Sequence, residues 1–285
     1  MTHLLKQNKK EKTIHLVKNG YTIFECKNSG RRFLEIRDAN NHVKEVYSDD
    51  YFFEGKQGYP NYLDEKDLLI QYGITYAEIV SNYINPGKVL SVGCAAGFIL
   101  KGFQQCGWDC YGLEPNETMA TYGRDILNLN IVTGDLESFQ STEKKFDLVN
   151  MIQVIGHLYD VDKALLKVND LLKEGGTVIV ESWDMNSTFA KIMGKHWHEY
   201  SPPSVVNWFS DNTLTQLFKY YGFSLVAKGR PSKRISVKHG LSLFEESTPD
   251  FLLKKKLIKF AKATIGKFTI TYPPLDLKWY LFKKS

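Results

Sequence analysis

The sequence predicts an α/β protein built on a doubly wound, mostly parallel sheet of seven strands. Three observations predict this fold. Short apolar segments alternate with amphipathic segments of about ten residues from position 88 onward. The apolar segments run without polar alternation, as is typical of strands that are buried on both faces. Glycine, asparagine and proline separate the segments at turn positions. Strands and helices that alternate in this way form parallel sheets with crossover helices.

The first sixty residues predict a small β-rich extension. Asn19-Gly20 lies between two β-prone runs, Ile14–Val17 and Tyr21–Phe24, and an Asn-Gly pair in this setting is typical of a hairpin. The segments Arg32–Ile36 and Val43–Tyr47 continue the pattern of short apolar runs. We therefore expect a small antiparallel unit that includes both of them.

The elements of the main sheet follow in order after a helix over Leu63–Ile84, which Asn85-Pro86-Gly87 ends. The expected strands are Val89–Val92, Asp109–Leu113, Ile131-Val132, Phe146–Ile152, Thr177–Val180, Phe223–Ala227 and Lys278–Phe282. The helices between them are Phe98–Cys106, Asn116–Leu127, Val161–Leu172 and Asn212–Tyr221. Ser210-Asp211 can cap the last of these helices, and Gly222 closes it.

The composition argues against disorder, a membrane span and a disulfide-stabilised fold. The chain of 285 residues is 43% hydrophobic and 24% charged, which is close to the globular average. Its longest segment without charged or strongly polar side chains, Val89–Leu100, is shorter than the roughly 18 residues that a span needs. The lysine-rich residues 1–12 precede no apolar segment, unlike a secretory signal. The four cysteines show no C-x-x-C spacing, so we expect reduced thiols, no metal site and a cytoplasmic location.

Positive charge gathers in the last part of the chain. From Val226 onward there are 14 Lys and Arg residues against 4 Asp and Glu, whereas the whole chain has a net charge of +5. We expect a basic helical insertion over residues 249–267, with an amphipathic helix from Phe251 to Ile265. Two interpretations stay open. The helix covers the sheet with a solvated cationic face, or it contacts an anion such as a nucleotide-sugar, a lipid-linked glycan or a peripheral membrane surface.

The candidate site lies where the first three strands end, because ligands of open parallel sheets bind at the carboxyl ends of the strands. Gly93–Gly97 follows the first strand and offers small residues and a helix amino terminus. Glu114 ends the second strand, where a carboxylate can accept hydrogen bonds from both hydroxyls of a ribose. Asp135 follows the third strand and can accept from an adenine amino group. The three features together predict an adenosine site.

A nicotinamide dinucleotide does not fit this loop. Its fingerprint needs small residues at the first, third and sixth positions, the last for close packing of helix and strand. Counted from Gly93, these positions hold Gly93, Ala95 and Phe98. Because a phenylalanine stands where close packing needs glycine or alanine, we expect a ligand with an adenosine but no pyrophosphate.

Five segments together resemble a class I S-adenosylmethionine-dependent methyltransferase, which has a Rossmann-like core. They are Val89–Leu100, Gly112–Pro115, Gly134-Asp135, Phe146–Val149 and Leu171–Val180. Residues 158–223 are similar to small-molecule and sugar methyltransferases. The resemblance implies an extension and lid over residues 1–60 and a methyltransferase domain over residues 61–285, in which residues 183–210 form a cap on the acceptor side.

The resemblance also assigns roles to residues around the cofactor S-adenosylmethionine. The backbone of the Gly93–Gly97 loop passes under the methionine part, Glu114 holds the ribose, and Asp135 holds the adenine. The full set that it implies for the cofactor is Gly93, Ala95, Gly97, Glu114, Asp135, Leu136, Met151, Gln153, Tyr59 and Tyr62. Met151 and Gln153 border the sulfonium, and the two tyrosines close over the cofactor. This sequence departs from the pattern at Ser91, Ala95, Gly156 and Val205.

The expected reaction is O-methylation of a small hydroxylated acceptor, such as a sugar or glycan precursor in polysaccharide biosynthesis. A hydroxyl needs a base, and His157 is the leading candidate because it follows the fourth strand and histidine titrates near neutral pH. The other interpretation of His157 is a helix cap or a bond to loop backbone. His198, with His196 beside it, is the second candidate, from the cap.

Two further interpretations of the function stay open. A catalytically silent relative that binds the cofactor and acts through a protein partner would explain the substitutions Ser91, Gly156 and Val205. A nucleic-acid methyltransferase rests only on the basic tail, and after the fourth strand the chain has Asn150–Gln153 in place of the Pro-Pro motif typical of base methylation. The oligomeric state is left open.

Overall fold

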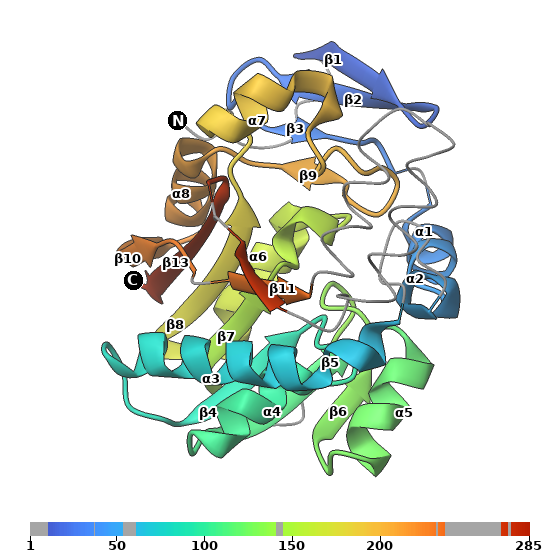
Figure 1. Ribbon diagram of the computed structural model, residues 1–285. Coiled ribbons are helices and arrows are strands. Elements are labelled where there is room, and N and C mark those ends of the chain that lie inside the picture. Colours follow the sequence, from blue (N-terminus) through green and yellow to red (C-terminus); the bar gives the residue numbers. More distant parts are fainter. Residues whose placement is uncertain are drawn as a thin grey trace.

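The computed structural model describes residues 11–36, 38–53, 61–140, 145–231, 233–236, 269–272 and 275–285 (Figure 1). Two expectations therefore lie outside the described residues: the basic helix within 249–267, and Tyr59. Among the described helices, none has the length and apolar character that crossing a bilayer requires.

A seven-stranded sheet forms the centre of the fold, as the sequence predicts. Its strand order is β10-β13-β8-β7-β4-β5-β6. Neighbouring strands from β8 to β6 are parallel, and β13 is antiparallel to both β8 and β10. The strands are β4 (Lys88–Val92), β5 (Asp109–Glu114), β6 (Asn130–Thr133), β7 (Phe146–Ile152), β8 (Leu172–Trp183), β10 (Phe223–Gly229) and β13 (Leu277–Lys284). The winding reverses between β4 and β7, so the loops after these two strands lie together at one edge.

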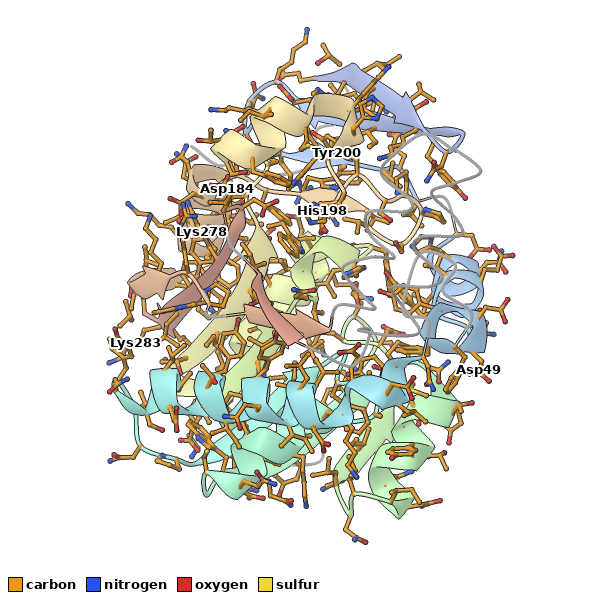
Figure 2. The ribbon with its side chains drawn as sticks, viewed as in Figure 1. Asp49, Asp184, His198, Tyr200, Lys278 and Lys283 are labelled. Atoms are coloured by element: carbon orange, nitrogen blue, oxygen red, sulfur yellow. The ribbon has the colours of Figure 1, made fainter. Side chains whose placement is uncertain are left out.

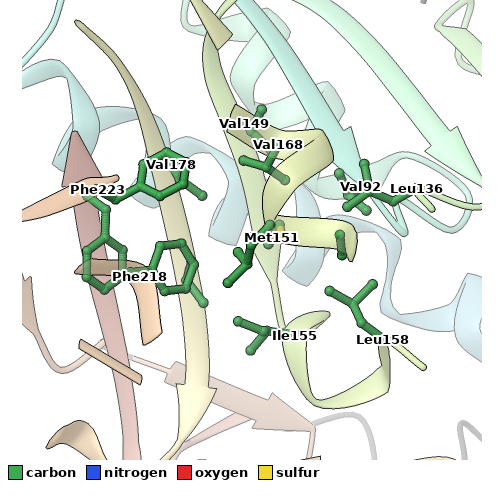
Figure 3. Packing of buried hydrophobic residues seen from close by; sticks show 14 of the residues in the cluster. Val92, Leu136, Val149, Met151, Ile155, Leu158, Val168, Val178, Phe218 and Phe223 are labelled. Atoms are coloured by element: carbon green, nitrogen blue, oxygen red, sulfur yellow. The ribbon is translucent and has the colours of Figure 1, made fainter. Parts of the chain in front are cut away.

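Helices pack on both faces of this sheet. The helices α3 (Lys66–Ser81), α4 (Phe98–Gln105) and α5 (Glu117–Asp125) contribute to one buried apolar cluster, and α6 (Val161–Leu171) and α8 (Asp211–Tyr220) to the other. Figure 3 shows part of the second cluster, which includes Met151 of β7 and Phe218 of α8. On the opposite face α3 and α4 cross at close range. Glycine at position 73 permits this approach, because a Cβ atom there would overlap the backbone carbonyl of Ile99.

The amino-terminal extension is a sheet that the cap completes. The hairpin of β1 (Lys12–Lys18) and β2 (Tyr21–Cys26) is present, and β3 (Arg32–Phe33) pairs with β2. Its fourth strand is β9 (Asn207–Trp208), which comes from the predicted cap segment and pairs with β3. The extension and the cap therefore share one sheet.

The expected strand over Val43–Tyr47 is wrong. This segment belongs to α1 (Ala39–Val46), which is followed by α2 (Asp49–Phe53). The Asp38 carboxylate accepts a hydrogen bond from the Asn41 backbone N–H at 3.0 Å and so caps the helix. The amide of Asn41 also donates to Glu45 one turn later, at 2.8 Å. These local bonds outweigh the β-propensity of two valines.

Shorter elements complete the described residues. They are the 3₁₀ turns η1 (Tyr62–Glu65), η2 (Ile155–His157) and η3 (Gly194–His196), the helix α7 (Thr188–Met193), and the strands β11 (Lys233–Ser236) and β12 (Thr269–Tyr272), which pair antiparallel.

Candidate active site

The loop between β4 and α4 has the backbone conformation of a ligand-binding turn. Gly93, Ala95 and Gly97 all have positive φ, at +58°, +47° and +81°. A Cβ atom on Gly97 would lie 2.6 Å from a methyl carbon of Leu129, so glycine is needed there for space as well as for conformation. Gly97 is also the N-cap residue of α4. The loop therefore places a helix amino terminus at the strand edge.

Glu114, at the end of β5, is a buried carboxylate held by this loop. It accepts hydrogen bonds from the backbone N–H groups of Ala95, at 2.7 Å, and Asn116, at 2.8 Å, one on each oxygen. Burial raises the pKa of Glu114 to about 7, although the two N–H donors act in the opposite direction. A carboxylate has about four lone-pair positions. Each oxygen can therefore still accept a further hydrogen bond.

Asp135 and its neighbours follow the next strand, β6. The Asp135 carboxylate accepts from the backbone N–H and the hydroxyl of Ser138, each at 2.8 Å, and from the Tyr159 hydroxyl at 3.3 Å. Leu136 beside it is buried in the apolar cluster under α6 and α8. Glu137 is a second buried carboxylate at this edge, and burial raises its pKa to about 7. Sequence reasoning missed Glu137, because nothing in its local pattern distinguishes it from an exposed loop acid.

The end of β7 carries the two residues expected at the sulfonium. Met151 is fully buried and faces the apolar cluster with α6 and α8 (Figure 3). Gln153 has a positive φ of +57°, and its N–H donates to the backbone carbonyl of Glu181 at 3.2 Å. Its side-chain Nε2 is buried and has no hydrogen-bond partner among the described residues. A non-glycine residue held in this conformation with an amide donor left over is a feature of binding sites.

Tyr62 lies against the start of α4. Its ring stacks on Phe98 with a centroid distance of 5.4 Å and an interplanar angle of 8°. Phe98 is the residue that argues against a dinucleotide fingerprint, and this packing gives its bulk a structural role. Tyr62 is buried beside the Gly93–Gly97 loop, where the resemblance places a residue that covers the cofactor.

A buried hydrogen-bonded pair of side chains joins α3 to β8, and sequence reasoning missed it. The Tyr76 hydroxyl of α3 donates a hydrogen bond to the Glu181 carboxylate of β8. Both side chains are buried, and burial together with Glu181 raises the pKa of Tyr76 well above its usual value. Because the backbone of Glu181 also binds Gln153, this pair fixes the end of β8 next to the end of β7.

His157 follows β7 and is anchored by the cap. Its Nδ1 lies 2.7 Å from the backbone carbonyl oxygen of Ser204. A carbonyl oxygen only accepts, so Nδ1 carries the hydrogen and the neutral ring keeps its lone pair on Nε2. Burial lowers the pKa of His157, which favours the neutral ring near pH 7. The bond to loop backbone that the sequence left open is therefore present, and it orients the ring without using Nε2.

His198 lies in the cap (Figure 2). A buried acid, Asp276, is close to it. The His198 Nδ1 is 4.0 Å from a carboxylate oxygen of Asp276, which also accepts from the Trp197 indole at 2.7 Å. The His198 ring meets Trp183 edge to face, with a centroid distance of 4.6 Å. The aromatic side chains that could have formed an open stacking surface, Trp197, Tyr200 and Trp208, are instead buried as the core of the cap.

The segment of residues 38–53, which contains α1 and α2, covers the strand edge and is called the lid below. Its Asp49 carboxylate accepts from the Asn116 amide at 3.0 Å and from the Thr118 hydroxyl at 3.1 Å, one on each oxygen. Figure 2 shows Asp49 at α2, close to the start of α5. Two residues earlier, the Tyr47 hydroxyl donates to the Ser204 carbonyl at 2.8 Å. Sequence reasoning missed both residues: it assigned Val43–Tyr47 to a strand and gave Asp49 no role.

The structure brings together a buried acid, a second acid one strand away and a glycine-rich turn, at the switch point of a parallel sheet where ligands of such sheets bind. The sequence also matches the family described as a methyltransferase domain over residues 74–228, which is more than half of the chain. The chain belongs to this family and is a class I S-adenosylmethionine-dependent methyltransferase.

Individual relatives have different acceptors. The chain is 32% identical over 107 residues to the dTDP-3-amino-3,4,6-trideoxy-alpha-D-glucopyranose N,N-dimethyltransferase of Streptomyces venezuelae, a match that covers 36% of this chain and 45% of that enzyme. It is 29% identical over 145 residues to the ubiquinone biosynthesis O-methyltransferase of Rickettsia felis, covering 48% of this chain and 56% of that enzyme. These two matches span about half the length of each relative.

Solved structures show the same fold. The magnesium protoporphyrin IX methyltransferase of Synechocystis PCC 6803, solved with bound S-adenosylhomocysteine, superimposes with a TM-score of 0.54 at 15% identity. The superposition covers 85% of this chain and 100% of that one.

Proposed function

We propose that this protein transfers the methyl group of S-adenosylmethionine to a hydroxyl group of a small acceptor, such as a sugar or a glycan precursor. One observation carries the choice of a hydroxyl: the anchored, neutral His157, whose Nε2 lone pair suits it to take a proton. Hydroxyls need such a base at neutral pH, whereas an unprotonated amine does not.

The cofactor lies, in this proposal, across the ends of β4, β5 and β6. Glu114 accepts from both ribose hydroxyls through the lone pairs that Ala95 and Asn116 leave open. Asp135 accepts from the adenine amino group, and the backbone next to Leu136 completes the base site. The Gly93–Gly97 loop passes under the methionine part, with Gln153 and the backbone of Met151 at the sulfonium.

Methyl transfer is an in-line displacement in which the oxygen–carbon bond forms as the carbon–sulfur bond breaks. Alignment of acceptor, methyl and sulfur can supply about 7–11 kcal/mol of the barrier. His157 takes the hydroxyl proton onto Nε2 and adds roughly 100- to 10,000-fold in rate. The Ser204 carbonyl stabilises the resulting imidazolium, because it keeps accepting from Nδ1. His198, with Asp276 beside its Nδ1, is the second candidate base from the cap.

Support for a small acceptor comes from the cover over His157 and from the relatives. The lid and the cap both contact the histidine, through Tyr47 and Ser204. Among the relatives, one methylates a nucleotide-linked sugar and another acts in ubiquinone biosynthesis. The four cysteines are free thiols. The free thiols support a cytoplasmic location, and the relative that methylates a nucleotide-linked sugar supports a step of polysaccharide biosynthesis. We extend the proposal to both.

The test measures the release of S-adenosylhomocysteine with three acceptor classes: nucleotide-sugars, catechols and amino sugars. We expect turnover with a hydroxyl acceptor. In His157→Asn the amide can still donate to the Ser204 carbonyl but offers no base, so kcat falls by roughly 100- to 10,000-fold while cofactor affinity stays within about twofold. His198→Asn is the matched variant for the second candidate. Turnover of amines alone, with no loss in His157→Asn, would contradict the proposal.

A further inference from the structure

The lid connects the two halves of the site through residues only two positions apart. Asp49 contacts the start of α5 on the cofactor side, and Tyr47 contacts Ser204 and His157 on the acceptor side. These contacts join parts of the chain that are 67 and 157 residues distant from the lid in sequence. A rigid movement of the lid would therefore make or break both sets together.

On the cofactor side the connection runs through Asn116. Its backbone N–H donates to Glu114, and its side-chain oxygen caps α5 by accepting from the Met119 N–H, each at 2.8 Å. Its side-chain amide donates to the Tyr47 carbonyl and to Asp49, each at 3.0 Å. Asn116 thus binds the ribose-site carboxylate with its backbone and the lid with its side chain.

On the acceptor side the connection is the Ser204 carbonyl. It accepts from the Tyr47 hydroxyl at 2.8 Å and from His157 Nδ1 at 2.7 Å, so both of its lone pairs are used. The Tyr47 ring also meets His157 edge to face, with a centroid distance of 5.9 Å and an angle of 78°. His42 of α1 is the other titratable group of the lid that affects His157.

We infer that Tyr47 is a positioning residue for His157. The lid holds Tyr47 in place when Asp49 is bound to Asn116 and Thr118, next to the cofactor ribose. This inference rests on the proposed function. Cofactor binding fixes Glu114 and Asn116, Asn116 seats the lid, and the lid fixes the ring of the base. Binding of the methyl donor therefore holds the base more firmly in this orientation.

The experiment follows the His157 ring by ¹⁵N NMR in the full chain, with S-adenosylhomocysteine as the probe and His157→Asn to assign the signal. In the unaltered chain we expect the probe to slow exchange of the Nδ1 hydrogen by at least about tenfold, which corresponds to about 1.4 kcal/mol, the size of one hydrogen bond. Tyr47→Phe keeps the ring and loses the hydroxyl, so it should bind the probe within about twofold yet lose this protection.

The second variant, Asp49→Ala, interrupts the cofactor side. It should bind the probe about three- to tenfold more weakly and, at saturation, leave His157 exchange at its probe-free rate. Glu45→Ala is the control, because its hydrogen bond from Asn41 lies within α1. Equal protection of His157 in the unaltered chain, Tyr47→Phe and Asp49→Ala would overturn the inference. Absence of probe binding to the unaltered chain would instead overturn the proposed function.

Discussion

Replacing Glu114 by glutamine tests the cofactor site and its electrostatics together. The side chain is 3% exposed, and its pKa of about 7 compares with 4.5 for an unperturbed carboxyl. That difference corresponds to about 3 kcal/mol of cost for holding the ionised form in the folded protein. Glutamine removes this cost, but it has one acceptor oxygen for two backbone N–H donors. The N–H of Ala95 or Asn116 then loses its partner, at about 1–3 kcal/mol.

The consequence for stability depends on pH with a defined sign. The folded state favours the protonated carboxyl, so this stabilisation is present below the unfolded pKa and is lost as pH rises through about 7. Between about pH 4.5 and pH 7 this residue lowers the free energy of unfolding by about 3 kcal/mol, and in Glu114→Gln this pH-dependent decrease should disappear. Urea unfolding at several pH values measures it. Glu137 contributes in the same direction, so Glu137→Gln provides a matched comparison.

The consequence for binding has the opposite dependence. Ribose hydroxyls donate to the ionised carboxylate, so affinity for S-adenosylhomocysteine should fall as pH drops below about 7, by up to about tenfold per pH unit. At about pH 8 Glu114→Gln should bind about 10- to 150-fold more weakly, the loss of charge-assisted hydrogen bonds of about 1.5–3 kcal/mol. Calorimetry measures both. Glu117→Gln, at an exposed acid of α5, is the control. Unchanged affinity in Glu114→Gln, with no pH dependence in the unaltered chain, would refute the ribose assignment.

Three other predictions concern the base, the helix contact and the cap. Since burial lowers the pKa of His157, kcat/KM for the acceptor, measured at saturating S-adenosylmethionine so that cofactor binding does not enter, should be flat near about pH 7 to 8 and fall on the acid side at a pKa below 6.5. A fall that begins above that value would point to another base. Gly73→Ala should lower the free energy of unfolding by about 3 kcal/mol or more, because the added methyl group would overlap the Ile99 carbonyl where α3 and α4 cross. Thr75→Ala, on the exposed side of α3, is the control and should change the free energy of unfolding by less than about 0.5 kcal/mol. Urea titrations measure both. Trp197→Phe leaves the buried Asp276 without its indole donor and should cost about 1–3 kcal/mol of stability; a neutral effect in thermal melts would show that another donor replaces it.

The positions of the residues expected at the cofactor could be predicted from sequence, because the features that place them are local. The turn at Gly93 needs small residues, and Glu114 stands at a strand end that the apolar pattern defines. The pKa of Glu114 could not be predicted, because it depends on burial by parts of the chain that the pattern does not connect.

The acceptor side could not be predicted in the same way. His157 was singled out by its place after β7, but its anchor is a backbone carbonyl at Ser204, which has no sequence signature. Tyr47 was missed because Val43–Tyr47 suggested a strand, whereas the Asp38 cap makes α1 a helix. Asp49 was missed because nothing in its local pattern distinguishes it from an exposed acid. Contacts between distant segments, each through an ordinary residue type, decide this half of the site.

The strand β9 gives the extension a consequence for the evolution of specificity. Since β9 pairs with β3, the framework around the proposed acceptor side is built partly from the amino-terminal extension, while the loops of the proposed methyl-donor side belong to the central sheet. Changes in the amino-terminal hairpin can therefore reshape what is methylated and leave the donor machinery intact. We expect a relative with a different amino-terminal segment to use the same methyl donor and to methylate a different acceptor.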